Sequence, residues 1–357
     1  MLARIPKKRD DQFEGKQSGY IASPSVDWAL IIGAPVMAVA LVQAFSQIQW
    51  LDTSFELLGV EQLPAPLLII VITHAHLFAV FFRSHGNQKI FVRHRAAFLV
   101  VPPALLAGFV VSDWAIISGL VVAVFWATYH IGMQSFGLGR IYDRLAGNPP
   151  EAARRLDYLL HQVINLGPFL AGMALIPTLS SLERFRAVGW DEPSQLTRAY
   201  GDLHGVFSLP LLVAGVSFLT YYAFSIHQLC KQGYVLSRQK LALLLTTGAV
   251  SVLAWGFMTP WKAFFVVNFF HSIQYLALVW WSEKVNLARL LRLAPGGRGR
   301  VLAFGVFMAA TLGFGFAYNQ YGTDYEQGRW AAAAALTVAL LHYWYDGFIW
   351  SVRRSEI

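Results

Sequence analysis

Six histidines and one aspartate lie within strongly apolar segments of this sequence. A polar side chain is costly inside a segment that crosses a membrane, so it usually faces an interior lined by protein and often carries function. Imidazole and carboxylate ligands together suit iron, zinc or copper. We therefore expect a buried metal site to which several helices contribute. The expected ligands are His74, His76, His130, His161, His271, His342 and Asp346.

The stretch 268–281, NFFHSIQYLALVWW, carries the densest group of polar residues in an apolar context. On a helix, Asn268, His271 and Tyr275 share one face, and Gln274 lies close beside it. Other buried histidines likewise have a polar residue about one turn later. Such neighbours can orient an imidazole or hold its second nitrogen. We predict a catalytic role beside the metal for Tyr275, Gln134, Gln274 and Asn268.

Two features of the ligand set restrict how it can be used. His74 and His76 are two residues apart, so on an ideal helix their side chains point about 200° from each other. Only one of them can then face a shared site unless the helix is distorted. Asp346, one turn after His342, is the only acid deep within an apolar segment. An isolated carboxylate there requires a cation, a metal or a proton, and we expect it to be ionised beside the metal.

The composition is that of a protein embedded in a membrane. Charged residues make up 13% of the 357 residues, whereas soluble domains usually contain about 25%. Hydrophobic residues make up 56%, and the mean hydropathy is +0.48. We predict an all-α fold, a polytopic integral membrane helical bundle of about ten transmembrane helices. The expected spans are 28–48, 66–82, 97–111, 115–136, 157–178, 205–226, 241–258, 263–282, 301–318 and 330–351.

The distribution of Lys and Arg predicts the orientation of these spans. If the N-terminus is cytoplasmic, 23 of the 28 Lys and Arg residues lie on the cytoplasmic side and five on the other. This is a strong positive-inside signal, and it explains the net charge of +8 without a nucleic-acid partner. Both termini are then cytoplasmic, and we expect the inner membrane of a bacterium. The predicted domains are a cytoplasmic segment 1–27, a transmembrane domain 28–351 and a cytoplasmic tail 352–357.

That orientation places the buried histidines at one depth, between the midplane and the cytoplasmic side. A shared partner is the simplest reason why several spans would each accept a polar group at the same level. The only cysteine, Cys230, excludes an intrachain disulfide and a thiolate cluster. Two histidines and a carboxylate that leave coordination positions open match the pattern of non-haem iron oxygenases. The larger set of histidines could equally hold two ions.

A site within the membrane receives lipophilic molecules and dissolved oxygen directly. The sequence therefore favours a metal-dependent membrane oxidoreductase, an oxygenase or oxidase that acts on a lipophilic small molecule. Its expected partners are the surrounding lipids and an electron-donor protein on the cytoplasmic side. Iron, as one or two ions, is the expected metal, with zinc, copper and haem as alternatives. Two other functions stay open: a haem-binding membrane protein, and a proton-coupled transporter with a His/Asp relay.

Four sequence blocks carry a resemblance to known proteins. HAHLFAVFFRSH, YHIGMQSFGLGRIYDR, FFHSIQYLALVW and HYWYDGFIW together resemble a group of bacterial polytopic membrane proteins with intramembrane histidines. This resemblance implies a shared site but no particular reaction. The layout alone, with single histidines spread over several spans, is similar to that of the microbial Brp/Blh-type beta-carotene dioxygenases. The paired HxxxH and HxxHH boxes of membrane fatty-acid desaturases and hydroxylases are missing from the sequence, which disfavours that family.

Overall fold

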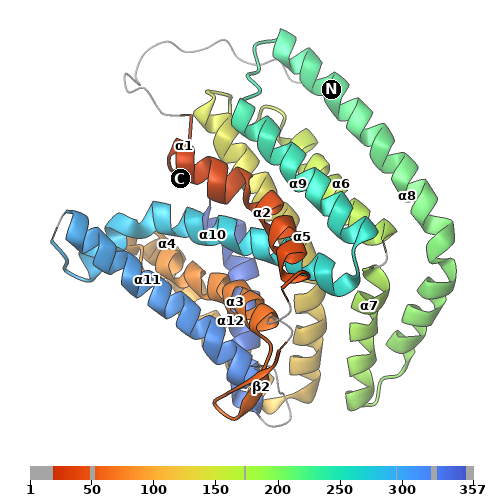
Figure 1. Cartoon of the computed structure of the whole chain (residues 1–357), viewed down its shortest axis with the longest axis vertical. Coiled ribbons are helices and arrows are strands. Elements are labelled where there is room, and N and C mark those ends of the chain that lie inside the picture. The colour runs from red at the N-terminus through yellow and green to blue at the C-terminus, as the bar shows by residue number, and fades with distance from the viewer. Residues whose placement is uncertain (1–18, 49–52, 173, 295, 323–327, 351–357) are drawn as a thin grey trace.

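The described part of the chain is almost entirely helical, which confirms the predicted all-α class. The computed structural model describes residues 19–48, 53–172, 174–294, 296–322 and 328–350 (Figure 1). Most of the predicted segment 1–27 and all of the predicted tail 352–357 lie outside these residues. The sole sheet within them is a hairpin of two antiparallel strands, β1 (Phe55–Leu57) and β2 (Val60–Gln62).

Helices make up the other elements of the described residues, and these include two π-helices, η1 and η4, and one 3-10 helix, η3. The first half of the chain contains α1 (Pro24–Val26), η1 (Asp27–Ile32), α2 (Ala34–Phe45), α3 (Pro64–Ser84), α4 (Gln88–Val111), α5 (Asp113–Leu145) and α6 (Arg154–Ala171). The second half contains α7 (Leu175–Leu179), η3 (Ser180–Val188), α8 (Glu192–Lys231), α9 (Arg238–Phe257), α10 (Pro260–Leu290), α11 (Gly297–Ala317), η4 (Tyr318–Gly322) and α12 (Arg329–Ile349).

Within the described residues, seven helices are long and apolar enough to cross a membrane: α3, α4, α5, most of α8, α9, α10 and α11. The number rises to nine if two broken pairs each form one span, α1–η1 with α2 and α6 with α7–η3. The first pair bends by 56° at Gly33. The seven do not include α12, the tenth predicted span, because His342, Asp346 and the tyrosines around them lower its hydropathy. The count of ten spans and their orientation stay predictions.

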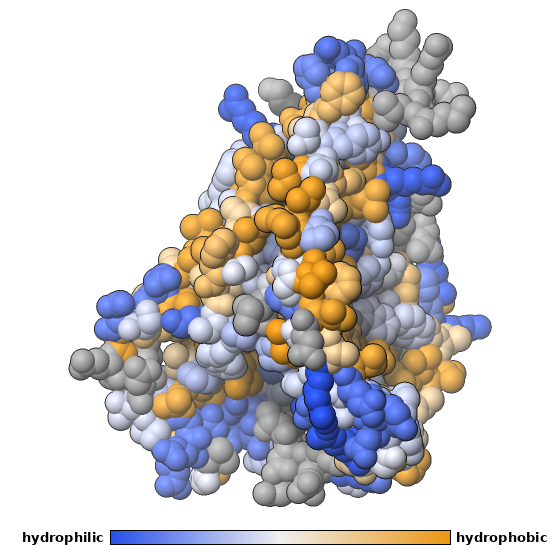
Figure 2. Space-filling model, turned by 90° about the vertical axis from the view of Figure 1, so that its right-hand side faces the viewer, coloured by the Kyte–Doolittle hydropathy of each residue, from blue (hydrophilic) through white to orange (hydrophobic). Residues whose placement is uncertain are grey.

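The surface of α8 fits a lipid environment better than water. The apolar window of this helix is 0% buried within the protein. Its exposed side chains include Leu209, Leu212 and Val216. Figure 2, which looks onto the side of the molecule that carries α8, shows apolar surface across the middle and hydrophilic residues above and below. A continuous apolar surface of this kind is unusual for a soluble monomer, so it supports a multi-pass membrane protein.

The central helix of the fold is α10 (Figure 1). Of its most apolar window, 72% is buried, and it packs against α2, α3, α9 and α11. Large apolar residues on its faces, such as Val266, Phe269 and Phe270, explain this burial. The last helix, α12, packs against α3, α4 and α5. The four helices that carry most of the predicted ligands, α3, α5, α10 and α12, therefore meet in the interior.

Glycines allow two of these helices to approach their neighbours closely. At Gly315 of α11, a Cβ atom would overlap the carbonyl oxygen of Val71 and lie 3.0 Å from the amide nitrogen of Ala75, both in α3. Gly132 and Gly139 of α5 face α6, where a Cβ atom at either position would come within 3.4 Å of a side-chain carbon. Close backbone contact through small residues is a common way to pack helices in membranes.

A network of paired charges is buried where α5, α6 and α9 meet. We call Arg140, Asp143, Asp157 and Lys240 the ionic cluster. Lys240 Nζ lies 2.8 Å from both Asp143 Oδ2 and Asp157 Oδ2. Arg140 Nη1 lies 2.6 Å from Asp157 Oδ2 and also contacts Asp143. Arg140 and Lys240, which the charge distribution treats only as orienting charges at span ends, are thus paired in the interior.

Two tyrosine hydroxyls complete the hydrogen bonds of the ionic cluster. Tyr222 of α8 donates to Asp157 Oδ1 at 2.9 Å. Tyr234, in the segment between α8 and α9, donates to Asp143 Oδ1 and accepts from Lys240 Nζ at 2.7 Å. Burial, reinforced by Asp143, raises the pKa of Tyr234, so its hydroxyl stays protonated. The ionic cluster therefore joins α5, α6 and α9 through charges that balance one another, and Tyr222 ties α8 to it by a hydrogen bond.

Candidate metal centre

Four of the predicted histidines meet where α3, α5, α10 and α12 converge. We call His76, His130, His271 and His342 the histidine cluster. The ring centroid of His76 lies 4.8 Å from those of both His271 and His342. The ring of His130 lies 5.0 Å from His271 and 4.7 Å from His342. All four side chains are buried, and each comes from a different helix, so helix packing brings them together.

The first group of ligating atoms consists of His130, His342 and Asp346. The Nε2 atoms of His130 and His342 lie 3.0 Å apart. Asp346 Oδ2 lies 3.7 Å from the first of these nitrogens and 3.9 Å from the second. Metal–ligand bonds of about 2.0–2.2 Å allow two ligands of one ion to stand up to about 4 Å apart. One ion can therefore reach all three atoms.

The second group consists of His76, His271 and His342, whose ligating atoms lie within 4.8 Å of one another. Ring movements of less than about 1 Å would bring them around one ion, given bonds of about 2 Å. His342 belongs to both groups, so the two groups form one continuous site. The arrangement can hold one ion that selects among five ligands, or two ions that share His342.

The hydrogen bonds of the histidine cluster test whether these residues fit a cation. His76 Nδ1 contacts the carbonyl oxygen of Thr73, which can only accept, so Nδ1 carries the proton and the lone pair is on Nε2. Among the described residues, His76 Nε2, both nitrogens of His271 and His342 Nδ1 have no hydrogen-bond partner. Buried polar atoms are rarely left unpaired. Such a concentration of unpaired ring nitrogens fits a bound metal ion.

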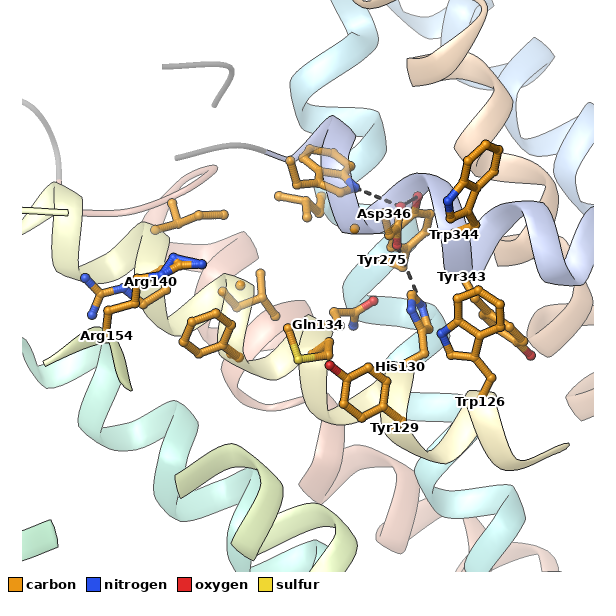
Figure 3. A pocket seen from close by; sticks show the side chains of 18 of the residues that line it. Trp126, Tyr129, His130, Gln134, Arg140, Arg154, Tyr275, Tyr343, Trp344 and Asp346 are labelled. Atoms are coloured by element: carbon orange, nitrogen blue, oxygen red, sulfur yellow. Dashed lines mark hydrogen bonds and ion pairs between the residues drawn. The ribbon is translucent and has the colours of Figure 1, made fainter. Parts of the chain in front are cut away.

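Two donors hold the carboxylate of Asp346 (Figure 3). The Tyr275 hydroxyl donates to Asp346 Oδ1 at 2.7 Å, and Trp350 Nε1 donates to the same oxygen at 3.0 Å. Oδ2 is left to face His130 and His342. Hydrogen bonds of this kind orient a ligating carboxylate and restrict its rotation. Two donors on one oxygen favour the carboxylate form, and the low exposure of the side chain opposes it, so the ionised state of Asp346 stays a prediction.

Three residues with a predicted catalytic role, Gln134, Gln274 and Asn268, donate hydrogen bonds to backbone carbonyls. Gln134 Nε2 donates to the His271 carbonyl at 3.0 Å and to Gln274 Oε1 at 3.1 Å. Gln274 Nε2 donates to the Ile31 carbonyl at 2.7 Å, which ties α10 to η1. Asn268 Nδ2 donates to a carbonyl of its own helix. Of the four residues with this predicted role, Tyr275 lies closest to the candidate ligands, because its hydroxyl donates to Asp346 and its ring centroid lies 4.6 Å from that of His342.

Two of the predicted ligands lie outside both groups. His74 stacks on Tyr318 with ring centroids 3.5 Å apart, and its Nδ1 lies 2.7 Å from the Ile70 carbonyl. Its direction differs from that of His76, as the two-residue spacing on a helix predicts. His161 Nδ1 lies 2.7 Å from the Asp157 carbonyl, beside the ionic cluster. Both imidazoles therefore make other contacts than a shared metal centre.

Two cavities adjoin the histidine cluster. The larger cavity has a volume of about 470 Å³ and is lined by His130 and Asp346 (Figure 3). The smaller cavity has a volume of about 160 Å³ and is lined by His76, His130 and His271. His130 thus separates the two, together with Tyr343, which also lines both. The larger volume falls within the usual range of small-molecule sites, about 300–1,000 Å³.

One face of α5 forms a long wall of the larger cavity. Trp126, Tyr129, Met133 and Gly137 follow one another at helical spacing along this face. Tyr129 is 37% exposed, so the larger cavity reaches the molecular surface beside α5. A Cβ atom at Gly137 would meet no other atom within 4 Å, which leaves open space at that point of the wall. The wall is mostly aromatic and apolar.

Three residues at these sites were not singled out by the sequence patterns. Ser272 Oγ lies 2.8 Å from His76 Nδ1, and Trp350 holds Asp346. Ser272 directly follows a predicted ligand and Trp350 lies one turn after another, so a search of helical neighbours would find both. Arg154, which lines the larger cavity, begins α6 after a turn and has no such signal in the sequence.

Comparison with known proteins adds no functional information. No family model matches the chain, and neither the curated proteins nor the solved structures contain a match to it. The resemblance to bacterial membrane proteins with intramembrane histidines is therefore neither supported nor opposed by these comparisons.

Proposed function

We propose that the protein is a membrane-embedded oxidoreductase that uses non-haem iron to oxidise a lipophilic small molecule with dissolved oxygen. The observation that carries this proposal is the group formed by His130, His342 and Asp346 beside the larger cavity. Two imidazoles and one carboxylate with open coordination positions are the ligand set of non-haem iron oxygenases. The unpaired nitrogens of His76, His271 and His342, which form the adjoining second group, support a metal rather than a purely structural role.

The residues around the site have distinct roles in this proposal. His130, His342 and Asp346 hold the iron, which supplies the redox chemistry when bound. Tyr275 and Trp350 fix the carboxylate through Oδ1. The apolar wall of the larger cavity favours a lipophilic substrate over a polar one. The smaller cavity, on the other side of His130, has room for dissolved oxygen or a few water molecules.

The metals and cofactors that the sequence leaves open differ in how well they fit. Zinc and copper accept the same ligands as iron, so the element must be measured. Haem fits less well, because a macrocycle held by two histidines needs a gap between them. The rings of the histidine cluster instead lie edge to face, with neighbouring centroids 4.7 to 5.0 Å apart.

A proton-coupled transporter is the second candidate function. The observation in its favour is that cavities lie on both sides of His130, as a His/Asp proton relay requires. Such a relay works without a bound metal. The two candidates are therefore separated by metal content and by dependence on a proton gradient.

Elemental analysis of the detergent-purified protein tests the proposal. We expect at least one iron per chain in the wild type and in His74→Ala, whose imidazole lies outside both ligand groups. We expect loss of the metal in His130→Ala and in Asp346→Asn. The transporter would replace the oxidoreductase as the proposed function if two results were found together. The wild type would contain no transition metal, and proteoliposomes with the wild type would show uptake that depends on a proton gradient. Full metal content in Asp346→Asn would remove Asp346 from the ligand set.

We also propose a placement for the protein in the bacterial inner membrane. The proposal rests on the seven apolar helices and the uneven distribution of Lys and Arg. In this placement the chain crosses the membrane ten times and both termini lie in the cytoplasm. An electron-donor protein binds on the cytoplasmic side. A phosphatase reporter fused after Ile357 should be inactive, because this enzyme folds only in the periplasm. Active phosphatase would reverse the orientation.

A further inference from the structure

One cation that lines the larger cavity, Arg154, has no partner acid among the residues that the structure describes. Its backbone N–H donates to the Glu151 carbonyl, and the contact described for its guanidinium is with the Phe136 ring, whose centroid lies 5.7 Å from Cζ. Arg140 lines the same cavity, but its guanidinium is bound by Asp143, Asp157 and two backbone carbonyls. Of these two arginines, Arg154 is therefore the one whose charge remains available to a ligand.

This cation stands at the opposite end of the larger cavity from the metal centre. Figure 3 shows Arg140 and Arg154 on one side of the cavity and His130 with Asp346 on the other. His130 and Arg140 lie on one helix, ten residues apart, which corresponds to about 15 Å at 1.5 Å per residue. Between the two ends, the lining of α5 includes Met133, Phe136 and Gly137.

The arrangement combines one charged end with a long apolar interior. A purely apolar molecule in the larger cavity would leave the guanidinium of Arg154 without a counter-charge among aromatic rings. A small polar anion would leave the apolar wall uncovered. An amphiphile with an anionic head satisfies both, because its head can accept hydrogen bonds from the fork of guanidinium donors while its tail covers the apolar wall.

We propose that the larger cavity binds an anionic amphiphile, with its carboxylate or phosphate head at Arg154 and its apolar tail directed toward the histidine cluster. The identification of this amphiphile as the substrate rests on the proposed function. Binding of the head at Arg154 then determines which part of the tail reaches the metal centre. A chain long enough to cover about 15 Å places its far part, rather than its head, beside His130 and Asp346.

Binding of three probes with one chain length tests this proposal. Palmitate, hexadecyl phosphate and hexadecanol share a sixteen-carbon chain and differ in their heads. Binding is measured with radiolabelled probes on the full chain in nanodiscs of phosphatidylcholine, after treatment with a chelator. The variants are Arg154→Gln, Arg154→Lys and, as a matched control on the next residue of the same helix turn, Arg155→Gln. Arg155 is exposed and does not line the cavity.

We expect at least one of the two anions to bind the wild type more tightly than hexadecanol does. Arg154→Gln should lower the affinity for that anion by about 10-fold to 100-fold, the usual value of a hydrogen bond to a charged group. The affinity for hexadecanol should stay unchanged. Arg154→Lys should retain part of the binding, and Arg155→Gln should retain all of it. The ratio of palmitate to hexadecyl phosphate distinguishes a carboxylate from a phosphate head.

Three results would overturn the proposal: binding of none of the probes, equal affinity for hexadecanol and both anions, or equal losses in Arg154→Gln and Arg155→Gln. Thermal unfolding of each variant shows whether a loss reflects misfolding. Because the binding measurements use chelated protein, they do not depend on iron. A wild type that contains no metal but binds the anions through Arg154 would refute the proposed oxidoreductase and leave the anion site in place.

Discussion

The ionic cluster and the histidine cluster are both buried and polar, but they satisfy their atoms in opposite ways. In the ionic cluster, two cations face two carboxylates, and tyrosine hydroxyls occupy the remaining carboxylate oxygens. In the histidine cluster, four ring nitrogens have no hydrogen-bond partner among the described residues. The first arrangement is complete within the protein. The second is complete only with something else bound.

This difference separates a structural from a functional use of buried polarity. A paired charge network joins helices firmly, because removal of one member leaves another charge buried and unpaired. A buried neutral imidazole without a partner costs less free energy than a buried unpaired charge. The protein can therefore stay folded when the histidine cluster holds no ligand. Substitutions in the ionic cluster should therefore affect folding first, and substitutions at the histidine cluster should affect metal content first.

The largest effect on stability should follow from Lys240→Met. This change leaves Asp143 and Asp157 with Arg140 alone, and breaking a buried ion pair costs about 3–5 kcal/mol. We expect a marked fall in the thermal unfolding midpoint of the detergent-purified protein and in its level in the membrane. Lys231→Met, the same substitution at an exposed position near the end of α8, should behave as the wild type. An unchanged midpoint in Lys240→Met would remove the structural role of the ionic cluster.

His342→Ala should lower stability less than Lys240→Met but abolish metal binding. His342 is the member shared by both ligand groups, so neither group stays complete without it. We expect a loss of bound iron of at least about 10-fold in elemental analysis, because a three-ligand group becomes a two-ligand group. If His342→Ala keeps its iron and unfolds instead, the histidine cluster has the same structural role as the ionic cluster.

Tyr275→Phe and Tyr345→Phe make a matched pair that compares one bonded and one unbonded hydroxyl. Tyr275 donates to Asp346, whereas the buried hydroxyl of Tyr345 has no hydrogen-bond partner among the described residues. Loss of a hydrogen bond that orients a metal ligand typically lowers metal affinity or activity by about 10–100-fold. We expect a reduction of this size in iron affinity for Tyr275→Phe. Tyr345→Phe should match the wild type, and equal behaviour of the two variants would contradict the role of Tyr275.

The smallest effect on stability should follow from Gly137→Leu. A Cβ atom at this position meets open space in the larger cavity, so the change should alter stability by no more than about 0.5 kcal/mol. The new side chain should fill part of the cavity and weaken palmitate binding in nanodiscs. Gly132→Leu provides the contrast, because Gly132 is buried and its Cβ atom would already lie 3.4 Å from Asn165 Cβ, so we expect the longer side chain to push α5 and α6 apart. That variant should unfold at a lower temperature.

The sequence was sufficient to predict the members of the histidine cluster but not those of the ionic cluster. An imidazole in an apolar segment is conspicuous, and the spacing of His74 and His76 correctly indicates that they point apart. Lys240 and Arg140 stand at the ends of apolar segments, where basic residues are expected for orientation alone. Their pairing with Asp143 and Asp157 depends on how α5, α6 and α9 pack, which local patterns do not contain. The same applies to the shape of the larger cavity and to Arg154.

The contact between α11 and α3 determines which changes this protein can accept over evolutionary time. Gly315 lies against the backbone of Val71 and Ala75, and Ala75 directly precedes His76. Backbone atoms cannot rotate away from a new side chain, so any other residue at position 315 would displace α3 and carry His76 with it. Position 315 therefore acts as a spacer for the candidate metal centre, although neither ligand group includes a residue of α11. A relative that has lost this glycine should also have rearranged the His76 side of the centre, so the two positions should change together.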